Sequence, residues 1–199
     1  MTEFMQRRLL ALDTATYYTG YAYFESGDDP LALAGSKMCL IRYGNMKAKQ
    51  KQPFDIRCLE LCAKIRNFVV EEQCTDCLLE YPEFHAGSRG VSASRGGATL
   101  TLAFLCGSVC TGWQLHVAEV MKKSRGKVQL PLPQLVRPSK WKGQIPKTIS
   151  AARCKKKYGV EATKEIEYNY TDAIMMGDWW LKKGEIEVSH HILAERVDY

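Results

Sequence analysis

Three acidic residues lie far apart in the sequence, and each borders an apolar segment. Asp13 ends the run LLALD, Glu80 ends the run CLLE, and Asp172 opens the run DAIMMG. A carboxylate at the end of a buried element is costly to desolvate unless a cation compensates its charge. A divalent metal ion is the usual compensation, so these residues predict a metal site.

Carboxylates of this kind suit phosphodiester hydrolysis. Two metal ions held about 4 Å apart by bridging carboxylates activate a water and stabilise the leaving oxygen. The protein contributes mainly by positioning groups and stabilising charge. Each acid also has a structural alternative, with Asp13 as a turn former, Glu80 as an ion-pair partner and Asp172 as a partner of the helix dipole.

The segment 121–159 contains no Asp or Glu but holds twelve basic residues. They are Lys122, Lys123, Arg125, Lys127, Arg137, Lys140, Lys142, Lys147, Arg153, Lys155, Lys156 and Lys157. A segment of one charge sign is typical of a surface that binds a polyanion, and Trp141 within it favours nucleic acid. The alternative is a solvated basic face.

A chain of 199 residues, 46% of them apolar, is long enough for one α/β domain with a sizeable core. No apolar run approaches the roughly 20 residues of a membrane span, so no membrane partner is expected. The N-terminal residues do not resemble a secretory signal, which favours a cytoplasmic or nucleoid setting. The eight cysteines are expected to be reduced structural thiols, with a zinc or redox role for Cys74 and Cys77 as the alternatives.

Hydrophobic periodicity predicts five strands and four helices in the order βββαβαβαα. The strands are expected at 8–13, 19–24, 37–43, 75–80 and 130–136, and the helices at 54–72, 98–120, 147–158 and 170–183. Glycines and a proline make 81–97 a long loop. Asp13 and Glu80 then lie at the carboxyl ends of two strands, where ligands gather in open α/β sheets. Asp172 is expected in the first turn of the last helix, beside the same edge.

Three motifs resemble the RuvC branch of the RNase H-like nucleases. They are LALDTATYYTGYAYF around Asp13, CLLEYPEF around Glu80 and NYTDAIMMGDWWL around Asp172. The likeness covers roughly residues 8–183. The segment 137–147 (RPSKWKGQIPK) is similar to the basic stretch of phage-type RuvC-like proteins.

The resemblance implies an α/β fold with an RNase H-like mixed five-stranded sheet flanked by helices. It places a nuclease domain at 1–184 and a C-terminal tail of unknown role at 185–199. It also implies a Holliday-junction resolvase, a homodimer that nicks two strands of branched DNA symmetrically. Such an enzyme would use two Mg²⁺ ions per site, or Mn²⁺ in their place, in the cytoplasm of a bacterial cell or a phage-infected host.

The resemblance further implies five catalytic residues, of which the three acids also bind metal: Asp13, Glu80, Asp172, Lys142 and Lys147. One position departs from the family pattern. Asn169 stands three residues before the last acid, where a further acid or a His is common. Asn169 is either a neutral metal ligand or the helix cap. Asp178 is no substitute, because its spacing places it on a different face of the helix.

The same resemblance implies contacts with DNA. Tyr81 or Phe84, in the loop after Glu80, would wedge into the centre of the junction, with a core position as the alternative. The other expected contacts are basic or aromatic side chains of the long loop and the basic segment: Arg89, Arg95, Lys140, Trp141, Lys155, Lys156 and Lys157.

Helix 98–120 is apolar around most of its circumference. One side is expected to pack on the sheet and the other on a second copy, with Leu105 on the outer side. Two further functions stay open. A different RNase H-like branched-DNA or flap endonuclease would use the same acids, and a non-catalytic junction-binding protein would be compatible with Asn169. An actin-like ATPase would need a second glycine-rich phosphate loop and a much longer chain.

Overall fold

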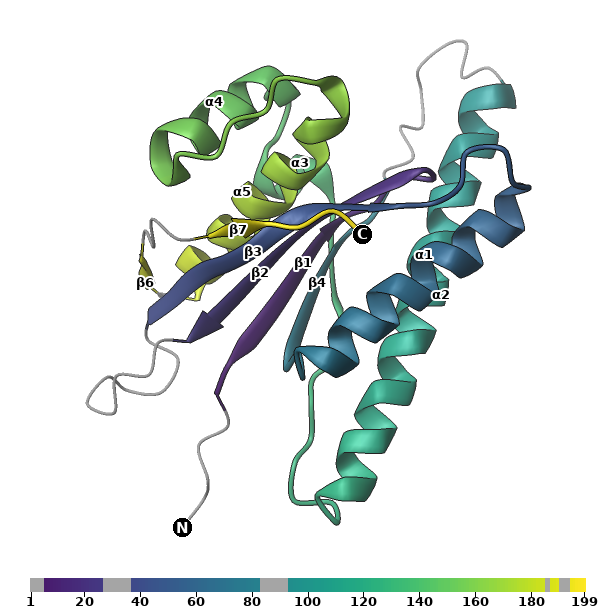
Figure 1. Ribbon diagram of the computed structural model, residues 1–199, viewed down its shortest axis with the longest axis vertical. Coiled ribbons are helices and arrows are strands. Elements are labelled where there is room, and N and C mark those ends of the chain that lie inside the picture. The colour runs from purple at the N-terminus through teal and green to yellow at the C-terminus, as the bar shows by residue number, and fades with distance from the viewer. Residues whose placement is uncertain (1–5, 27–36, 83–92, 185–186, 190–193) are drawn as a thin grey trace.

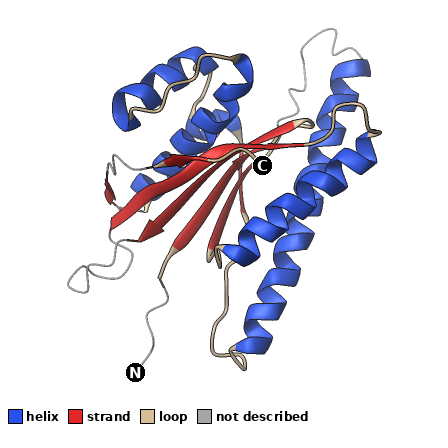
Figure 2. Ribbon diagram, in the orientation of Figure 1, coloured by secondary structure: helices blue, strands red, loops and turns tan. Residues whose placement is uncertain are grey.

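The computed structural model describes residues 6–26, 37–82, 93–184, 187–189 and 194–199. A twisted sheet forms the middle of three layers (Figure 1). The helices α1 (Phe54–Glu71) and α2 (Ala93–Lys123) cover one face, and α4 (Lys147–Tyr158) and α5 (Tyr168–Lys183) lie on the other (Figure 2). The layers match the α/β architecture that the sequence predicts.

Within the described residues, the sheet has seven strands in the order β5-β4-β1-β2-β3-β6, with β7 also paired to β3. They are β1 (Arg8–Asp13), β2 (Tyr18–Ser26), β3 (Lys37–Lys47), β4 (Asp76–Glu80), β5 (Gln134–Val136), β6 (Glu187–Ser189) and β7 (Glu195–Arg196). The first three are antiparallel neighbours, while β4 runs parallel to β1 and β5 runs parallel to β4. Strands β1 to β5 confirm the predicted mixed sheet. The predicted count of five is too low, because residues of the tail add two short strands beside β3.

Three boundaries differ from the prediction. Helix α2 begins at Ala93, inside the predicted loop. The glycines in this segment have low helix propensity, but helix propensity is a weak guide when a segment continues a long packed helix. Strand β5 is shorter than predicted, since prolines such as Pro131 cannot donate to a strand ladder. A short helix, α3 (Pro138–Trp141), follows β5, and a 3-10 turn, η1 (Glu165–Glu167), precedes α5.

The side chains on the two faces of β1 belong to two different hydrophobic cores. Leu10 and Leu12 belong to the first core, which lies under α1 and α2, whereas Leu9 and Ala11 belong to the second core, which lies under α5. The alternation follows from the period of two in a strand. Both faces are covered, so the end of β1 is held rigidly from two sides.

Helix α2 turns one side to the sheet and leaves the other outside. Leu105 is 0% exposed and packs in the first core, so the expectation that it lies on the outer side is wrong. Leu100 and Phe104 are instead the outward residues, at 65% and 57% exposure. Adjacent residues differ by about 100° around a helix, so Phe104 can face outward while Leu105 faces the core.

Among the described residues, one helical segment, Thr99–Lys123, passes a test for a membrane span on length and composition alone. Its mean hydropathy is 1.3. Core helices of soluble proteins pass the same test. Here Val109 and Trp113 of this helix pack with β4 and α1 in the first core.

The eight cysteines are free thiols, and most of them are buried. Burial raises the pKa of Cys62 and of Cys106 to about 11. Thiols with pKa values this high are poor nucleophiles and poor metal ligands at neutral pH. They serve here as small packing groups.

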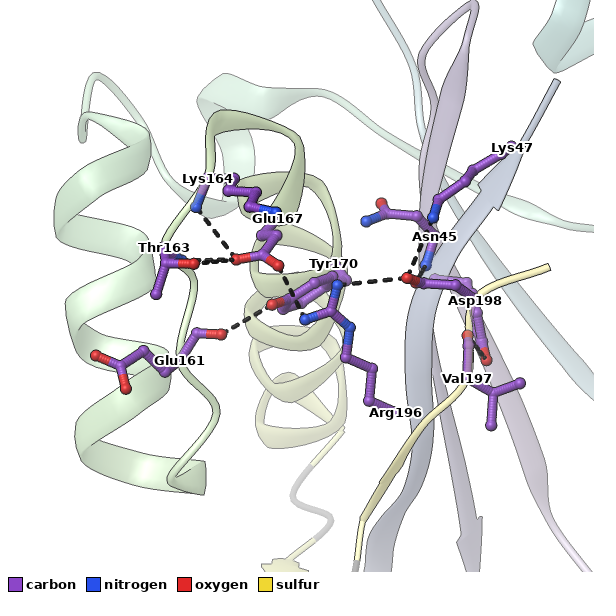
Figure 3. Close-up of polar contacts among 11 residues, drawn as sticks. Asn45, Lys47, Glu161, Thr163, Lys164, Glu167, Tyr170, Arg196, Val197 and Asp198 are labelled. Carbon is purple, nitrogen blue, oxygen red and sulfur yellow. Dashed lines mark hydrogen bonds and ion pairs between the residues drawn. The ribbon is translucent and has the colours of Figure 1, made fainter. Parts of the chain in front are cut away.

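The tail residues 194–199 run along β3, joined to it by backbone hydrogen bonds. Arg196 pairs with Glu167 at 2.9 Å and with Asp198 at 3.3 Å (Figure 3). Asp198 in turn accepts a hydrogen bond from the backbone N–H of Asn45 in β3. Because Glu167 directly precedes α5, the tail holds the start of that helix against the sheet.

Candidate functional site at the carboxyl edge of the sheet

Asp13 and Glu80 end two neighbouring parallel strands. Leu12 of β1 is in register with Leu79 of β4, so the next residue of each strand is one of the two acids. Asp13 is buried, and the side chain of Glu80 is nearly so. Thr14 helps to fix their spacing, because its hydroxyl donates to the backbone carbonyl of Glu80 at 3.1 Å. The structure confirms that the two acids meet at one edge.

Asp172 reaches the same edge from α5, which packs across β1 and β2. It lies two residues further into the helix than the sequence predicts, because α5 begins at Tyr168. Its side chain is fully buried. Gly20 of β2 permits this approach, since a Cβ there would lie 2.2 Å from the carbonyl carbon of Asn169. The glycine therefore marks a position where the backbone of α5 comes into close contact with β2.

Lys142 lies between two of the acids. Its Nζ is 2.8 Å from Oδ2 of Asp172 and 3.7 Å from Oε2 of Glu80. Burial lowers the pKa of Lys142, but the two carboxylates outweigh it and hold the pKa above its ordinary value. The side chain therefore stays charged inside the site.

Lys147, at the start of α4, approaches from the solvent side. Its Nζ is 3.6 Å from Oδ2 of Asp13 and 3.9 Å from Oδ2 of Asp172. It also donates to Oδ1 of Asn169 at 3.0 Å. Since its side chain is 46% exposed, the ammonium can turn towards a ligand outside the protein.

Asn169 is not the helix cap. Glu167 occupies the cap position of α5, and Asn169 is the second residue of the helix. The Asn169 amide donates to the backbone carbonyl of Tyr18 at 3.1 Å, which leaves its carbonyl oxygen turned to Lys147. Of the two roles predicted for Asn169, the ligand role remains a prediction and the cap is wrong.

Asp13 is the electrostatically strained member of the group. Burial raises its pKa, the charge of Glu80 raises it further, and Lys147 opposes both effects only in part. Oδ2 of Asp13 and Oδ1 of Asp172 are buried and have no hydrogen-bond partner within the described part of the chain. Buried carboxylate oxygens without donors are suited to a hard divalent cation, so the donor set fits Mg²⁺ or Mn²⁺.

The three carboxylates are not arranged as a complete metal-binding site. Within the described ranges, no three His, Cys, Asp or Glu side chains surround one possible ion position. The contacts of Lys142 explain this, because its ammonium stands where a cation shared by Asp172 and Glu80 would lie. A metal ion would have to draw these carboxylates away from the lysine.

Trp141 holds Glu80 in place. Its indole N–H donates to Oε2 of Glu80 at 2.8 Å, and the ring packs beside the second core. The sequence predicts Trp141 as a DNA contact, and it does not reveal this hydrogen bond to an acid that lies 61 positions away. The indole therefore orients the carboxylate, as supporting hydrogen bonds do around metal ligands.

The residues predicted to contact DNA differ in their exposure, and some of them lie outside the described residues. Tyr81 is partly buried and packs against the first core, which matches its structural alternative. Phe84 and Arg89 lie outside the described residues, and so does the side chain of Arg95, whose backbone is in the first turn of α2. Lys140 is exposed beside the site.

The lysine cluster of α4 is partly neutralised. Lys155 pairs with Glu161 at 2.6 Å, and Lys157 pairs with the buried Asp178. Lys156 is exposed. The basic segment lacks acids in sequence, but the fold brings acids to it from outside the segment. Asp178 pairs with Lys157 and does not join the three acids, as its spacing from Asp172 along the helix predicts.

The strand order and the acids at the carboxyl edge define an RNase H-like fold. No protein-family model and no curated protein sequence matches the chain. Several solved structures match the chain, and they share a RuvC-like fold. RuvC of Thermus thermophilus with a Holliday junction substrate has a TM-score of 0.58 at 10% identity, covering 91% of this chain and 98% of that one.

Two further structures agree. Thermus thermophilus RuvC has a TM-score of 0.53 at 13% identity, covering 90% of this chain and 98% of that one. The yeast mitochondrial Holliday junction resolvase Ydc2 has a TM-score of 0.55 at 15% identity, covering 90% and 82%. At these identities the likeness shows the fold alone.

Proposed function

We propose that this protein is a metal-dependent endonuclease that resolves four-way DNA junctions by paired symmetric nicks. The observation that carries the proposal is the meeting of Asp13, Glu80 and Asp172 at one edge of a RuvC-like sheet. Three acids from three elements in a buried position are costly for the fold, which supports a catalytic use. The proposed location is the cytoplasm of a bacterial or phage-infected cell.

The acids would act as oxygen ligands for two Mg²⁺ or Mn²⁺ ions, with Asn169 adding a neutral oxygen. When bound, the ions would supply an activated water and stabilise the leaving oxygen of the phosphodiester. The chain itself keeps the ligands in place. Trp141 orients Glu80, and the packing of α5 over Gly20 sets the depth of Asp172.

Lys142 and Lys147 would change partners when DNA binds. Without DNA, their ammonium groups offset the repulsion among the three carboxylates. With metal on the carboxylates, the ammonium groups would instead donate to the scissile phosphate. Charge-assisted hydrogen bonds to a phosphate oxygen stabilise the charge that develops in the transition state.

Paired nicks need two sites in fixed relation, and we propose a homodimer through the outer side of α2. Leu100, Phe104 and Leu115 are exposed there. A Cβ at Gly107, between these residues along the helix, would meet no atom within 4 Å, so a second helix can approach closely. A two-fold axis through this surface would relate the two sites as the two-fold symmetry of a junction requires.

Cleavage of a synthetic four-way junction tests the proposal. Unmodified protein with Mg²⁺ or Mn²⁺ should nick two opposite strands at symmetric positions, and Asp13→Asn should nick neither. Junction, flap and linear duplex are compared in parallel, because another RNase H-like nuclease would prefer a flap. Binding of the junction without cleavage in either metal would point to a non-catalytic junction-binding protein.

A further inference from the structure

A groove beside the carboxylate site is lined by basic and indole side chains. It runs between β5, the residue preceding β1 and the C-terminal half of α5, and has a volume of about 610 Å³. Its main side chains are Arg7, Arg137, Lys140, Trp179, Trp180 and Lys183. Among the described residues that line it, four are cations and none is an acid. A groove of this charge is suited to a polyanion.

Cations already stand over both indoles. Lys183 Nζ lies 5.6 Å from the centroid of the Trp179 ring, and Arg7 Cζ lies 5.2 Å from that of Trp180. Arg7 also pairs with Asp76 at 3.2 Å, so it is a fixed part of the wall. Both rings are only partly buried, at the edge of the second core. Partly exposed indoles flanked by cations are the groups on which nucleobases stack.

The groove adjoins the proposed active site. Helix α5 carries both Asp172 and Trp179, which are about 10 Å apart along the helix axis. A smaller hollow of about 200 Å³ shares Trp179 and is lined by Trp141 and Lys142 of the site. A nucleic-acid strand that leaves the carboxylates along α5 would therefore reach Trp179 first.

We propose that this groove binds unpaired nucleotides of the DNA strand next to the cleavage position. Their bases would stack on Trp179 and Trp180, and their phosphates would contact Arg137, Lys140 and Lys183. Unpaired nucleotides are favoured over duplex because base pairing and stacking bury the base faces that an indole needs. The choice of DNA as the polymer rests on the function proposed above, whereas the groove itself does not.

Binding without divalent metal tests the inference separately from cleavage. The probe is a short oligodeoxythymidylate, titrated in EDTA against the full chain while tryptophan fluorescence and the anisotropy of a 5′ label are recorded. The unmodified protein should bind with quenching. Trp179→Leu should weaken binding roughly tenfold and lose most of the quenching, since stacking on an aromatic ring contributes about this much per base.

Further variants and probes keep the test decisive. Lys183→Glu, at the exposed end of α5, should weaken binding with little effect on folding, while Lys51→Glu, at an exposed position outside both the groove and the basic segment, serves as the matched control. An abasic oligomer of equal length should bind more weakly than oligodeoxythymidylate. Equal affinity for abasic and thymine oligomers, or unchanged binding in both groove variants, would overturn the inference. Loss of oligomer binding in these variants would support it even if junction cleavage is never found.

Discussion

Gly20 and Asn169 are in backbone contact, and this contact sets how deeply α5 can settle on β2. A Cβ on Gly20 would stand 2.2 Å from the carbonyl carbon of Asn169 and 2.5 Å from the backbone nitrogen of Tyr170. No side-chain rotation can relieve a clash with backbone atoms. The position of Asp172, one turn further along α5, therefore depends on the absence of a side chain in β2.

Gly20→Ala should displace the start of α5 and reduce cleavage together with stability. We expect a loss of about 1–3 kcal/mol in the free energy of unfolding, as for other overpacked sites. Thermal unfolding and junction cleavage measure the two effects. Gly112→Ala is the control, because a Cβ there meets nothing within 4 Å and alanine favours a helix. Normal cleavage by Gly20→Ala would show that the depth of α5 is not critical.

Asp13→Asn should abolish cleavage and yet stabilise the metal-free protein. Burial and the charge of Glu80 raise the pKa of Asp13, so its ionised form opposes folding at neutral pH. A neutral amide of the same shape should raise the free energy of unfolding by about 1 kcal/mol, or roughly 2–4 °C in melting temperature. Melting in EDTA and junction cleavage in Mg²⁺ are the measurements. A destabilised variant would mean that the Asp13 charge serves the fold.

Glu167 should give the protein an acid-sensitive component. Burial raises the pKa of Glu167, but hydrogen bonds from Thr163 and Arg196 outweigh it and bring the pKa to about 2, below the ordinary 4.5. The folded state thus binds fewer protons, so this stabilisation is complete above about pH 4.5 and is lost as the pH falls towards 2. Melting temperatures from pH 2 to 6 should fall less steeply for Glu167→Gln, whereas the exposed Glu161→Gln should follow the unmodified protein.

Phe104→Glu should yield a folded monomer that retains DNA binding and loses paired nicking. A charge at this exposed position is tolerated in the monomer but not in an apolar helix–helix contact. Sedimentation and the ratio of single to paired nicks are the measurements. Leu132→Glu, at a site of 61% exposure outside α2, is the control. An unmodified protein that sediments as a monomer, alone and on a junction, would contradict the dimer.

Lys140 and Lys157 should respond differently to removal of their charge. Lys140 is exposed, so Lys140→Gln should lower the log–log salt dependence of DNA affinity by about 0.9, the value for one phosphate that is no longer neutralised. Lys157 pairs with the buried Asp178, so Lys157→Gln should mainly reduce stability. Titrations at several salt concentrations, with melting curves, separate the two. A salt dependence that falls as far in Lys157→Gln as in Lys140→Gln would place Lys157 on DNA.

The sequence predicted those parts of the site that depend on strand order. Asp13 and Glu80 end apolar strands, and the carboxyl ends of parallel neighbours meet whatever the side chains around them. The pairing of β1 with β4 and the approach of α5 could therefore be predicted from hydrophobic periodicity and from the RuvC resemblance. The roles of the residues in catalysis and in DNA binding remain predictions.

Features that depend on contacts between residues far apart in the sequence could not be predicted from it. The indole of Trp141 meets Glu80 only through the fold, and Asp178, which pairs with Lys157, lies 21 positions further along the sequence. Leu105 was placed on the wrong side of α2, because a helix that is apolar around its circumference does not reveal which side the sheet covers. The tail showed no strong pattern, since its strands are very short and depend on β3 for pairing.

The position of Lys142 has a thermodynamic consequence. The ammonium group of Lys142 lies 2.8 Å from Oδ2 of Asp172, so a metal ion bound by that carboxylate oxygen would have to displace it. Whatever draws the lysine outward leaves the carboxylate better able to bind a cation, and a cation on the carboxylate leaves the lysine better able to donate to a phosphate. In the proposed enzyme, reciprocity requires that the affinity for metal and the affinity for DNA rise together by the same factor. A free protein would then hold metal weakly and take it up fully only on its substrate, which limits hydrolysis of DNA to which it is not properly bound.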